Sequence, residues 1–316
     1  MEAELGVGVV VVAVGLYIAS SLYLLHNPLL LHKKKSLAFY SRHISHRGGA
    51  GERIENTMEA FTHAVQVGTE MLELDCNLTL DGYVVVCHDK NLKILTGSDV
   101  NISSVKFQDL PLYKEKLEVI FSAGQYSTGK DRRIALLEDV FKKFPQVPIN
   151  IEVKQNNDLL VQKVSDLVKK YDRETITVWA SDDSEIMAKC RKQNPYMPYS
   201  FTPRRGILLL VLYYTGLLPF CPLGESLLQF YLPSVINRGY IPEEAIFKNR
   251  FAVYLIEKLT MRKSLFEHLV KRGMQVHLFV CNNEKDMAEA FAFGATGVMS
   301  DYPTILSDYL KKHPAV

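Results

Sequence analysis

Residues 43–75 read HISHRGGAGERIENTMEAFTHAVQVGTEMLELD, a short apolar run, a glycine-rich loop, a helical pattern and a second apolar run. The helical part, 55–68, ends at Gly68, where a helix-terminating glycine is expected. A strand, a helix and a second strand in this order predict two parallel strands of one sheet. The fold is therefore expected to be α/β.

Strand and helix patterns keep alternating along the chain. Short β-prone apolar runs predict strands, and apolar residues at helical spacing predict helices. The expected strands are 43–46, 71–75, 83–88, 150–154, 176–180, 275–280 and 296–300, and the expected helices are 55–68, 136–144, 158–171, 184–193, 263–273 and 284–294. This many units predict a (β/α)8 TIM barrel rather than an open parallel sheet.

An uncharged run precedes this alternation. Residues 6–25, GVGVVVVAVGLYIASSLYLL, are long enough to cross the roughly 30 Å hydrocarbon core of a bilayer as a helix. HKKK at 32–35 follows the run and only Glu2 and Glu4 precede it, whereas a cleavable signal peptide favours basic residues in front. We therefore expect residues 1–35 to form a retained membrane anchor, with a cleaved signal peptide as the alternative.

The side of the membrane on which the rest of the chain lies stays open. The basic residues after the run favour the cytosolic side. The triplets NLT at 77–79 and NIS at 101–103 match the N-glycosylation acceptor pattern, which favours the luminal side.

A second apolar stretch, RGILLLVLYYTGLLPFCP at 205–222, interrupts the alternation. Its apolar part is shorter than a membrane span and longer than a barrel strand. A buried core helix is one explanation. A membrane-dipping element inserted in a loop of the barrel is the other, and the nearby bilayer anchor favours it.

The composition excludes some functions. The formal net charge of +2 over 316 residues lacks the basic excess of a nucleic-acid-binding protein. The cysteines contain no CxxC pair, so neither a zinc site nor a disulfide framework is predicted; they are Cys76, Cys87, Cys190, Cys221 and Cys281. No segment indicates an obligate protein partner.

Two acidic residues share one face of the expected strand at 71–75. Glu73 and Asp75 are two positions apart, so they project from the same side, and Leu72 and Leu74 project from the other. A solvated strand face would also allow this pattern. With leucines on the helix-covered side, however, the acids point towards the barrel axis, where like charges need a cation between them.

Further polar residues are expected beside this pair. The tight turn LDG at 80–82 folds the chain back and returns His88 to the level of Asp75. In NIEVK, Glu152 and Lys154 share one strand face. Three carboxylates offer only oxygen ligands, which select a hard divalent cation, magnesium or calcium, and not zinc.

The first expected strand ends at His46, next to the glycine-rich loop. Arg47 offers a planar fork that suits phosphate oxygens, and the glycines within 48–51 would let the backbone pass close to a ligand. A single histidine is more often structural, but His46 and His88 both end a strand and precede a charged residue. Histidine titrates near neutrality, so one could accept a proton while the other donates one.

Five ordered motifs resemble those of the glycerophosphodiester phosphodiesterase family. They are HRGG with ENT (46–57), ELD (73–75), HD (88–89), NIEVK (150–154) and GATGVMSDYP (294–303). The match covers roughly residues 40–311, which would be the catalytic barrel. Any one motif alone would be weak, whereas the ordered set is specific.

This resemblance implies a barrel of the phosphatidylinositol-phospholipase-C type and assigns residue roles. His46 and His88 would be the acid–base pair, Glu73, Asp75 and Glu152 the metal ligands, and Arg47, Lys154, Asn56, Phe279 and Asn282 the phosphate- and substrate-binding residues. Members often carry a tryptophan where this chain has Phe279, which alters the wall of the substrate cleft. Calcium is preferred to magnesium on the resemblance alone.

With its anchor and its apolar stretch, the chain most resembles the membrane-bound branch of the family, the lysophospholipases D. That branch implies hydrolysis of lysophospholipids, including lysophosphatidylcholine and N-acyl lysophosphatidylethanolamine, to lysophosphatidic acid and a head-group alcohol through a cyclic phosphate. It also implies an integral protein of the endoplasmic reticulum and other internal membranes.

Two other functions remain as alternatives. One is cleavage of water-soluble glycerophosphodiesters, such as glycerophosphocholine to glycerol 3-phosphate. The other is a non-catalytic lipid-binding scaffold, against which the intact set of histidines and carboxylates argues. No serine or cysteine is placed as a nucleophile, so water or the substrate's own hydroxyl must attack.

Overall fold

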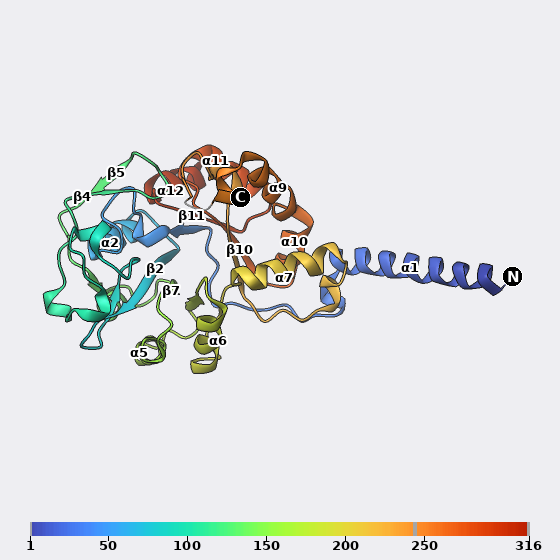
Figure 1. Ribbon diagram of the computed structural model, residues 1–316, viewed down its shortest axis with the longest axis horizontal. Coiled ribbons are helices and arrows are strands. Elements are labelled where there is room, and N and C mark those ends of the chain that lie inside the picture. The colour runs from blue at the N-terminus through green and yellow to red at the C-terminus, as the bar shows by residue number, and fades with distance from the viewer. Residues whose placement is uncertain (1, 243–244, 315–316) are drawn as a thin grey trace.

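Parallel strands lie at the centre of the molecule and helices surround them, while α1 (Glu2–His26) projects away from the rest (Figure 1). The computed structural model describes residues 2–242 and 245–314. The central strands are β1 (His43–Ser45), β2 (Met71–Leu78), β7 (Ile149–Val153), β8 (Thr177–Ala180), β9 (Leu227–Tyr231), β10 (Gln275–Phe279) and β11 (Gly297–Ser300). They pair in parallel in the order β8–β7–β2–β1–β11–β10–β9.

The eighth position of the barrel is a very short segment between β8 and β9. Tyr199 forms a parallel bridge with Trp179 of β8, and Ser200 forms one with Leu227 of β9. The Ser200 N–H donates to the Trp179 carbonyl at 2.9 Å, and the Phe201 N–H donates to the Leu227 carbonyl at 3.0 Å. The segment thus closes the ring of eight, and the predicted TIM barrel is confirmed. The sequence pattern predicts neither this segment nor β9.

Helices cover the outside of the barrel. The larger ones are α2 (Met58–Gln66), α4 (Leu137–Lys143), α5 (Asp158–Lys170), α6 (Ser184–Gln193), α7 (Pro203–Tyr214), α9 (Arg250–Thr260), α10 (Lys263–Lys271), α11 (Glu284–Ala292) and α12 (Pro303–Lys312). The short ones are α3 (Lys93–Thr96), α8 (Ala245–Lys248) and the 3₁₀ turns η1 (Pro28–Leu30), η2 (His46–Gly48), η3 (Ile102–Ser104), η4 (Phe107–Asp109), η5 (Leu218–Phe220) and η6 (Pro233–Val235). Side chains cap several starts: Thr57 accepts from the Ala60 N–H at α2, and Asn157 accepts from the Leu159 N–H at α5.

The apolar stretch at 205–222 supplies a helix of the barrel itself. Helix α7 directly follows the closing segment at 199–200 and precedes β9, so it takes the helix position of the fifth βα unit. This differs from the expected insertion in a loop. It also differs from a buried core helix, because several of its apolar side chains are exposed, Ile207 at 65% and Val211 at 51%.

A hairpin extends β2 beyond the barrel. Strand β3 (Val84–Val86) pairs antiparallel with the end of β2, with Cys76 opposite Val86. The Cys87 N–H donates to the Asp75 carbonyl at 2.9 Å, so the predicted turn does bring this strand back beside Asp75. β3 continues to β6 (Ala135–Leu136), and β4 (Lys116–Glu118) pairs with β5 (Tyr126–Thr128) in a separate hairpin. The strand expected at 83–88 therefore belongs to the hairpin and not to the barrel.

Side chains along the strands alternate between two environments. Leu72 and Leu74 of β2 point outwards and pack among residues of α2, α4 and α5. Met71 lies inside with Ile44 and Met299 of neighbouring strands. The next inward positions of β2 are Glu73 and Asp75, so the barrel interior changes from apolar to charged towards the carboxyl ends of the strands.

The glycines of the HRGG loop serve packing within the chain. A Cβ on Gly51 would lie 2.5 Å from the Tyr302 ring, and one on Gly49 would lie 2.7 Å from Pro303. Gly49 also has a φ of 94°, which favours glycine. The Gly51 N–H donates to the Asp301 carbonyl at 2.9 Å. These glycines therefore join the loop to the SDYP segment, where the sequence suggested close approach to a ligand.

Helix α1 is attached to the barrel near its C-terminal end and projects away from it. Among the described residues it is the one helix long and apolar enough to cross a membrane, from Gly8 to His26, and nearly all of that length is exposed. The triplet at 77–79 no longer favours the luminal side, because Asn77 is fully buried in β2 and its amide donates to the Cys87 carbonyl.

Candidate active site

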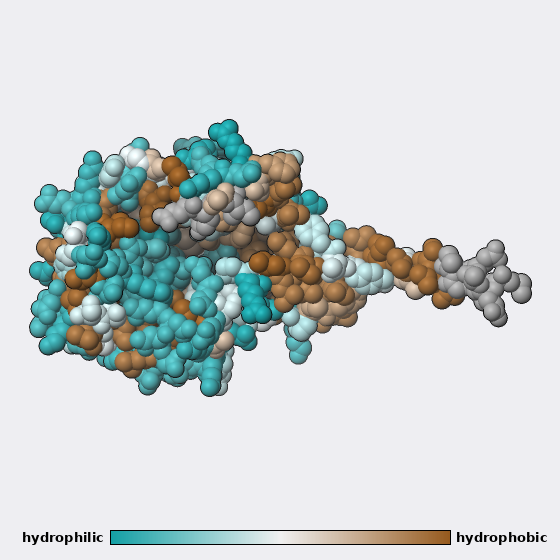
Figure 2. Space-filling view, viewed as in Figure 1, coloured by the Kyte–Doolittle hydropathy of each residue, from teal (hydrophilic) through white to brown (hydrophobic). Residues whose placement is uncertain are grey.

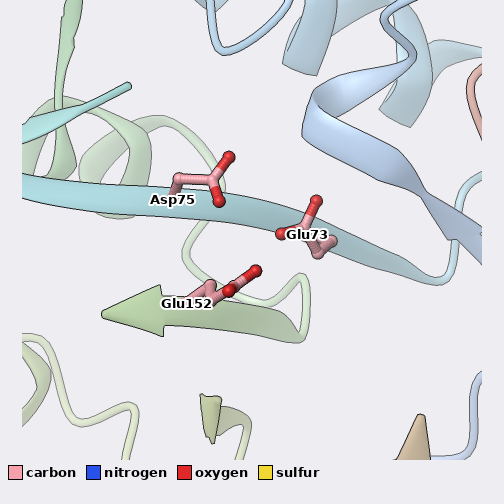
Figure 3. A group of neighbouring side chains, drawn as sticks. All are labelled: Glu73, Asp75 and Glu152. Atoms are coloured by element: carbon pink, nitrogen blue, oxygen red, sulfur yellow. The ribbon is translucent and has the colours of Figure 1, made fainter. Parts of the chain in front are cut away.

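Three carboxylates meet at the carboxyl ends of β2 and β7. Strand β2 carries Glu73 and Asp75, and the parallel register places Glu152 of β7 directly opposite Asp75. Each residue has one carboxylate oxygen that lies within 4.8 Å of an oxygen of each of the other two. Figure 3 shows Glu152 reaching from β7 towards Glu73 on β2.

The cluster holds negative charge in a buried place. Burial, with the charges of Asp75 and Glu152, raises the pKa of Glu73 well above its usual range. Burial also raises the pKa of Glu152 to about 7, although Lys154 opposes the change. Burial would raise the pKa of Asp75 as well, but nearby cations led by Lys154 outweigh it and lower that pKa. The three groups thus repel one another, and a cation between them would relieve the repulsion.

A hard divalent cation fits this donor set. Asp75 Oδ1 is buried and has no hydrogen-bond partner among the described residues, and Lys154 Nζ lies 3.2 Å from it. Every available donor atom in the cluster is a carboxylate oxygen, which magnesium and calcium prefer. Glu73, Asp75 and Glu152 would hold such an ion.

Two basic residues lie beside the acids. Lys154 Nζ is 2.7 Å from Glu152 Oε1. Arg47 is buried, and its guanidinium donates to both oxygens of Glu55 at 3.2 and 3.1 Å. Its left-handed backbone, with φ at 50°, lets its N–H donate to Glu73 Oε2 at 2.8 Å. Both residues lie at the predicted site, and their contact with a phosphate stays a prediction.

His46 is held by a buried carboxylate. Its Nδ1 lies 2.6 Å from Asp301 Oδ1, and its Nε2 lies 4.0 Å from Glu73 Oε2. The Asn282 amide donates to Asp301 Oδ2 at 2.9 Å and accepts from the Asp301 N–H at 2.9 Å. The carboxylate therefore fixes the proton on Nδ1 and leaves Nε2 facing the acids. Asn282 holds Asp301, and its predicted contact with substrate stays a prediction.

His88 has the same arrangement in a more open place. Its Nδ1 lies 2.7 Å from Asp89 Oδ1. His88 lines an open cleft of about 670 Å³ together with Glu152 and Lys154. The sequence prediction that the hairpin returns His88 to the acid cluster is consistent with this shared cleft.

The remaining predicted residues lie close by. Asn56 is fully buried, and its amide donates to Asp75 Oδ2 at 3.1 Å, so it orients a carboxylate. The Phe279 ring lies 4.5 Å from the Tyr231 ring, and Phe121 contacts both Tyr231 and the edge of His46. Phe279 thus belongs to an aromatic wall beside His46, and its role in the wall of the substrate cleft stays a prediction.

Three carboxylates of the site were not assigned roles from the sequence: Asp301, Asp89 and Glu55. Each had a signal in the chain. Asp301 follows β11 in the SDYP motif, Asp89 adjoins His88, and Glu55 precedes Asn56 in ENT. What the sequence lacks is the pairing, since Asp301 is 255 positions from His46.

Residues 46–305 match the sequence model of the glycerophosphoryl diester phosphodiesterase family. The chain belongs to this family. It is therefore a phosphoric diester hydrolase, as its motifs indicated, and its acidic cluster suits the divalent metal that members of this family use.

Relatives within the family cover nearly the whole chain. Human lysophospholipase D GDPD1 is 50% identical over 301 residues, covering 95% of this chain and 96% of the relative. Human lysophospholipase D GDPD3 is 47% identical over 301 residues, covering 95% of each. The identities place GDPD1 slightly above GDPD3. They do not distinguish calcium from magnesium, so the preference for calcium stays a prediction.

Solved structures agree with the fold. The glycerophosphoryl diester phosphodiesterase domain of Rv2277c from Mycobacterium tuberculosis superimposes with a TM-score of 0.67 at 17% identity, covering 85% of this chain and 99% of that domain. At this identity the likeness supports the family barrel and says nothing of substrate.

Proposed function

We propose that this phosphodiesterase is a lysophospholipase D, which releases the head-group alcohol of lysophospholipids and leaves lysophosphatidic acid. One observation carries the proposal. His46 and His88, each bound to a carboxylate through Nδ1, flank a cluster of three carboxylates at the carboxyl ends of the strands. The names of GDPD1 and GDPD3 supply the class of substrate.

The open cleft beside His88 suits the head group. Beyond the catalytic groups, its charged lining consists of the carboxylates Asp89, Asp182 and Asp183 and the ammonium groups of Lys90 and Lys93. Groups of both signs at this rim suit a polar alcohol, whether it is charged like choline or uncharged like N-acyl ethanolamine. The aromatic wall of Phe121, Tyr231 and Phe279 lies on the His46 side and favours the less polar glycerol and acyl part.

The two histidines divide the proton transfers. The free glycerol hydroxyl beside the phosphate attacks phosphorus and gives its proton to His46 Nε2, which Asp301 keeps available. The bond from phosphorus to the head-group oxygen breaks, and His88 protonates that oxygen as the alcohol leaves. Water then opens the cyclic phosphate with the two roles exchanged.

Charge on the phosphate oxygens requires cationic neighbours. A divalent ion held by Glu73, Asp75 and Glu152 would act as a Lewis acid on a phosphate oxygen. Lys154 lies at the edge of that cluster and neutralises charge that develops on the phosphate. Arg47, whose Nε lies 3.5 Å from Asp75 Oδ2, provides a further fixed positive charge beside the cluster.

Helix α1 would tether this activity to a membrane. We assign residues 1–35 to the anchor and 40–311 to the catalytic barrel, in the endoplasmic reticulum and other internal membranes. A lysolipid substrate and an apolar exposed α1 are consistent with each other.

Product analysis tests the proposal. Purified protein in detergent is given lysophosphatidylcholine, N-acyl lysophosphatidylethanolamine and glycerophosphocholine, each with magnesium or with calcium, and the products are identified by mass. We expect choline or N-acyl ethanolamine together with lysophosphatidic acid. Turnover of glycerophosphocholine alone would replace the proposal with the soluble-substrate phosphodiesterase, and no turnover of any diester would favour a scaffold.

A further inference from the structure

The base of α1 is attached to the barrel along its side. The Tyr17 hydroxyl donates to the Thr215 carbonyl, and Ser21 Oγ donates to the Gly216 carbonyl at 2.7 Å. The Tyr17 and Phe220 rings stack 6.4 Å apart. The turn that joins α7 to η5 is therefore bound to the C-terminal half of α1, at Tyr17 and Ser21, and not to its last residues.

This attachment fixes a depth. If residues 6–25 cross the hydrocarbon core, Tyr17 lies about 12 Å inside the boundary near Leu25, at 1.5 Å per helical residue. The turn at 215–220 would then lie in the same leaflet. Since α7 and β9 on either side of it belong to the barrel, the stretch enters and leaves from one side and makes no second crossing.

The side chains around this point are exposed and apolar. We define the basal collar as Leu29, Leu30 and Leu31 beside η1, Leu217 and Phe220 at the turn, and Leu255 and Leu259 of α9. Each of these side chains is more than 40% exposed, and Leu30 reaches 63%. A monomeric soluble protein rarely leaves such a group of large apolar side chains together in water.

Hydrogen bonds join the parts of the collar. His32 Nε2 lies 2.8 Å from the Pro219 carbonyl, which links the η1 region to the turn. The Tyr214 hydroxyl donates to the Leu259 carbonyl at 2.8 Å, which links the end of α7 to the end of α9. Figure 2 shows hydrophobic surface over α7 and over α9, next to the emerging α1.

Helix α9 contributes a face that the barrel leaves uncovered. Phe251, Tyr254, Leu255 and Leu259 recur at helical spacing, and all four are exposed, whereas Val253 on the other side is buried. A basic residue of α10 lies at the base of α1, where Lys271 Nζ donates to the His26 carbonyl at 2.9 Å. Apolar side chains with adjacent basic ones are typical of elements that lie in a membrane interface.

We propose that the basal collar lies within the leaflet from which α1 emerges, so that the barrel is seated in the bilayer and not suspended from a flexible tether. The inference rests on the proposed membrane anchoring of α1. The bilayer is the occupant because the turn that carries Leu217 and Phe220 is hydrogen-bonded, through Thr215 and Gly216, to the one membrane-length helix among the described residues. Helix α9 becomes a second membrane element, and α7 with its turn becomes an interfacial one.

Depth-dependent quenching of tryptophan fluorescence tests whether the basal collar lies in the bilayer. The chain has a single tryptophan, Trp179, which is fully buried and gives a constant background. Full-length variants Leu217→Trp and Leu259→Trp report on the collar, Leu16→Trp reports on α1, and Tyr126→Trp of β5, at the end of the barrel away from α1, is the matched exposed control. Each is reconstituted into vesicles of diacyl phosphatidylcholine brominated either near the head group or deep in the acyl chain.

We expect both collar reporters to lose most of their emission with the shallow bromines, Leu217→Trp also to be quenched by the deep ones, and Tyr126→Trp to be unaffected. Leu16→Trp should be quenched most by the deep bromines. If Leu16→Trp is quenched while the collar reporters behave like Tyr126→Trp, the collar lies outside the bilayer, and the membrane anchoring of α1 still holds. If Leu16→Trp is not quenched either, the membrane anchoring fails and the seat fails with it. Release of choline from lysophosphatidylcholine, measured on the same samples, shows separately whether the proposed activity holds.

Discussion

At the carboxyl ends of the strands this protein buries charged side chains, whereas at the base beside α1 it exposes apolar ones. Glu73 and Asp75 are at most 3% exposed, while Leu30 and Phe251 are more than 60% exposed. Buried like charges cost several kcal/mol unless they are paired, and exposed apolar groups lose the benefit of burial. The buried carboxylates become favourable when they bind a cation with a phosphate. The exposed apolar side chains become favourable when they contact a bilayer.

Removing the cation should have the largest effect at the charged end. Chelation is expected to abolish phosphodiesterase activity, and magnesium or calcium should restore it while zinc should not, because the donors are all carboxylate oxygens. A thermal melt with and without the metal should also show a lower Tm for the stripped protein, since the ion relieves repulsion in the folded state. Activity that survives exhaustive chelation would show that the reaction needs no divalent cation.

Loss of either histidine comes next. His46→Ala and His88→Ala should each reduce kcat about 10²–10⁴-fold, as expected for general acid–base groups, with the Tm little changed. Asp166→Asn, an exposed carboxylate of α5, serves as a neutral control. A histidine variant that keeps half of the wild-type rate would refute the assignment of that residue.

The carboxylates behind the histidines should matter unequally. Asp301→Asn is expected to lower kcat about 10- to 100-fold, because it removes the charge that orients His46 and supports its protonated form. Asp89→Asn should lower kcat by less. The Asp89 side chain is 23% exposed, so water can replace part of its role, whereas the Asp301 side chain is 1% exposed. Comparing the pH profiles of kcat for the two variants separates orientation of the base from general damage, and an equal effect would contradict the distinction.

The sequence was sufficient where a short-range pattern carries the chemistry. Leucines alternating with Glu73 and Asp75 were enough to direct the acids inwards, and the LDG turn was enough to return His88. The same reasoning placed α6 at the bounds that the structure gives, 184–193.

The parts that the sequence could not give depend on contacts between distant segments. Nothing in the SDYP motif says that Asp301 meets His46. The closing segment at 199–200 is too short to show a strand period, so the barrel's eighth position is visible only in three dimensions. The apolar stripe of α9 has the spacing of an ordinary core helix, and only the fold shows that this stripe faces outwards.

The smallest predicted effect concerns histidines that are buried without serving the site. Burial lowers the pKa of His43 to about 4 and that of His277 to about 3. As the pH falls below about 6.5 the unfolded chain binds these protons first, so each residue should cost roughly 2 kcal/mol of stability by pH 5. Urea unfolding of the wild type and of His277→Gln between pH 7 and 5 measures this, and the variant should lose stability less steeply. Equal slopes would mean that His277 does not contribute.

At the charged end of the barrel, we propose, the substrate's own hydroxyl breaks the diester between His46 and His88. Turnover of lysophosphatidylcholine is measured beside that of its 2-O-methyl ether, which keeps the head group and the phosphate but cannot form the cyclic product. We predict release of choline from the free-hydroxyl lipid and none above background from the ether. Comparable rates for the two lipids would contradict the claim and make water the direct nucleophile.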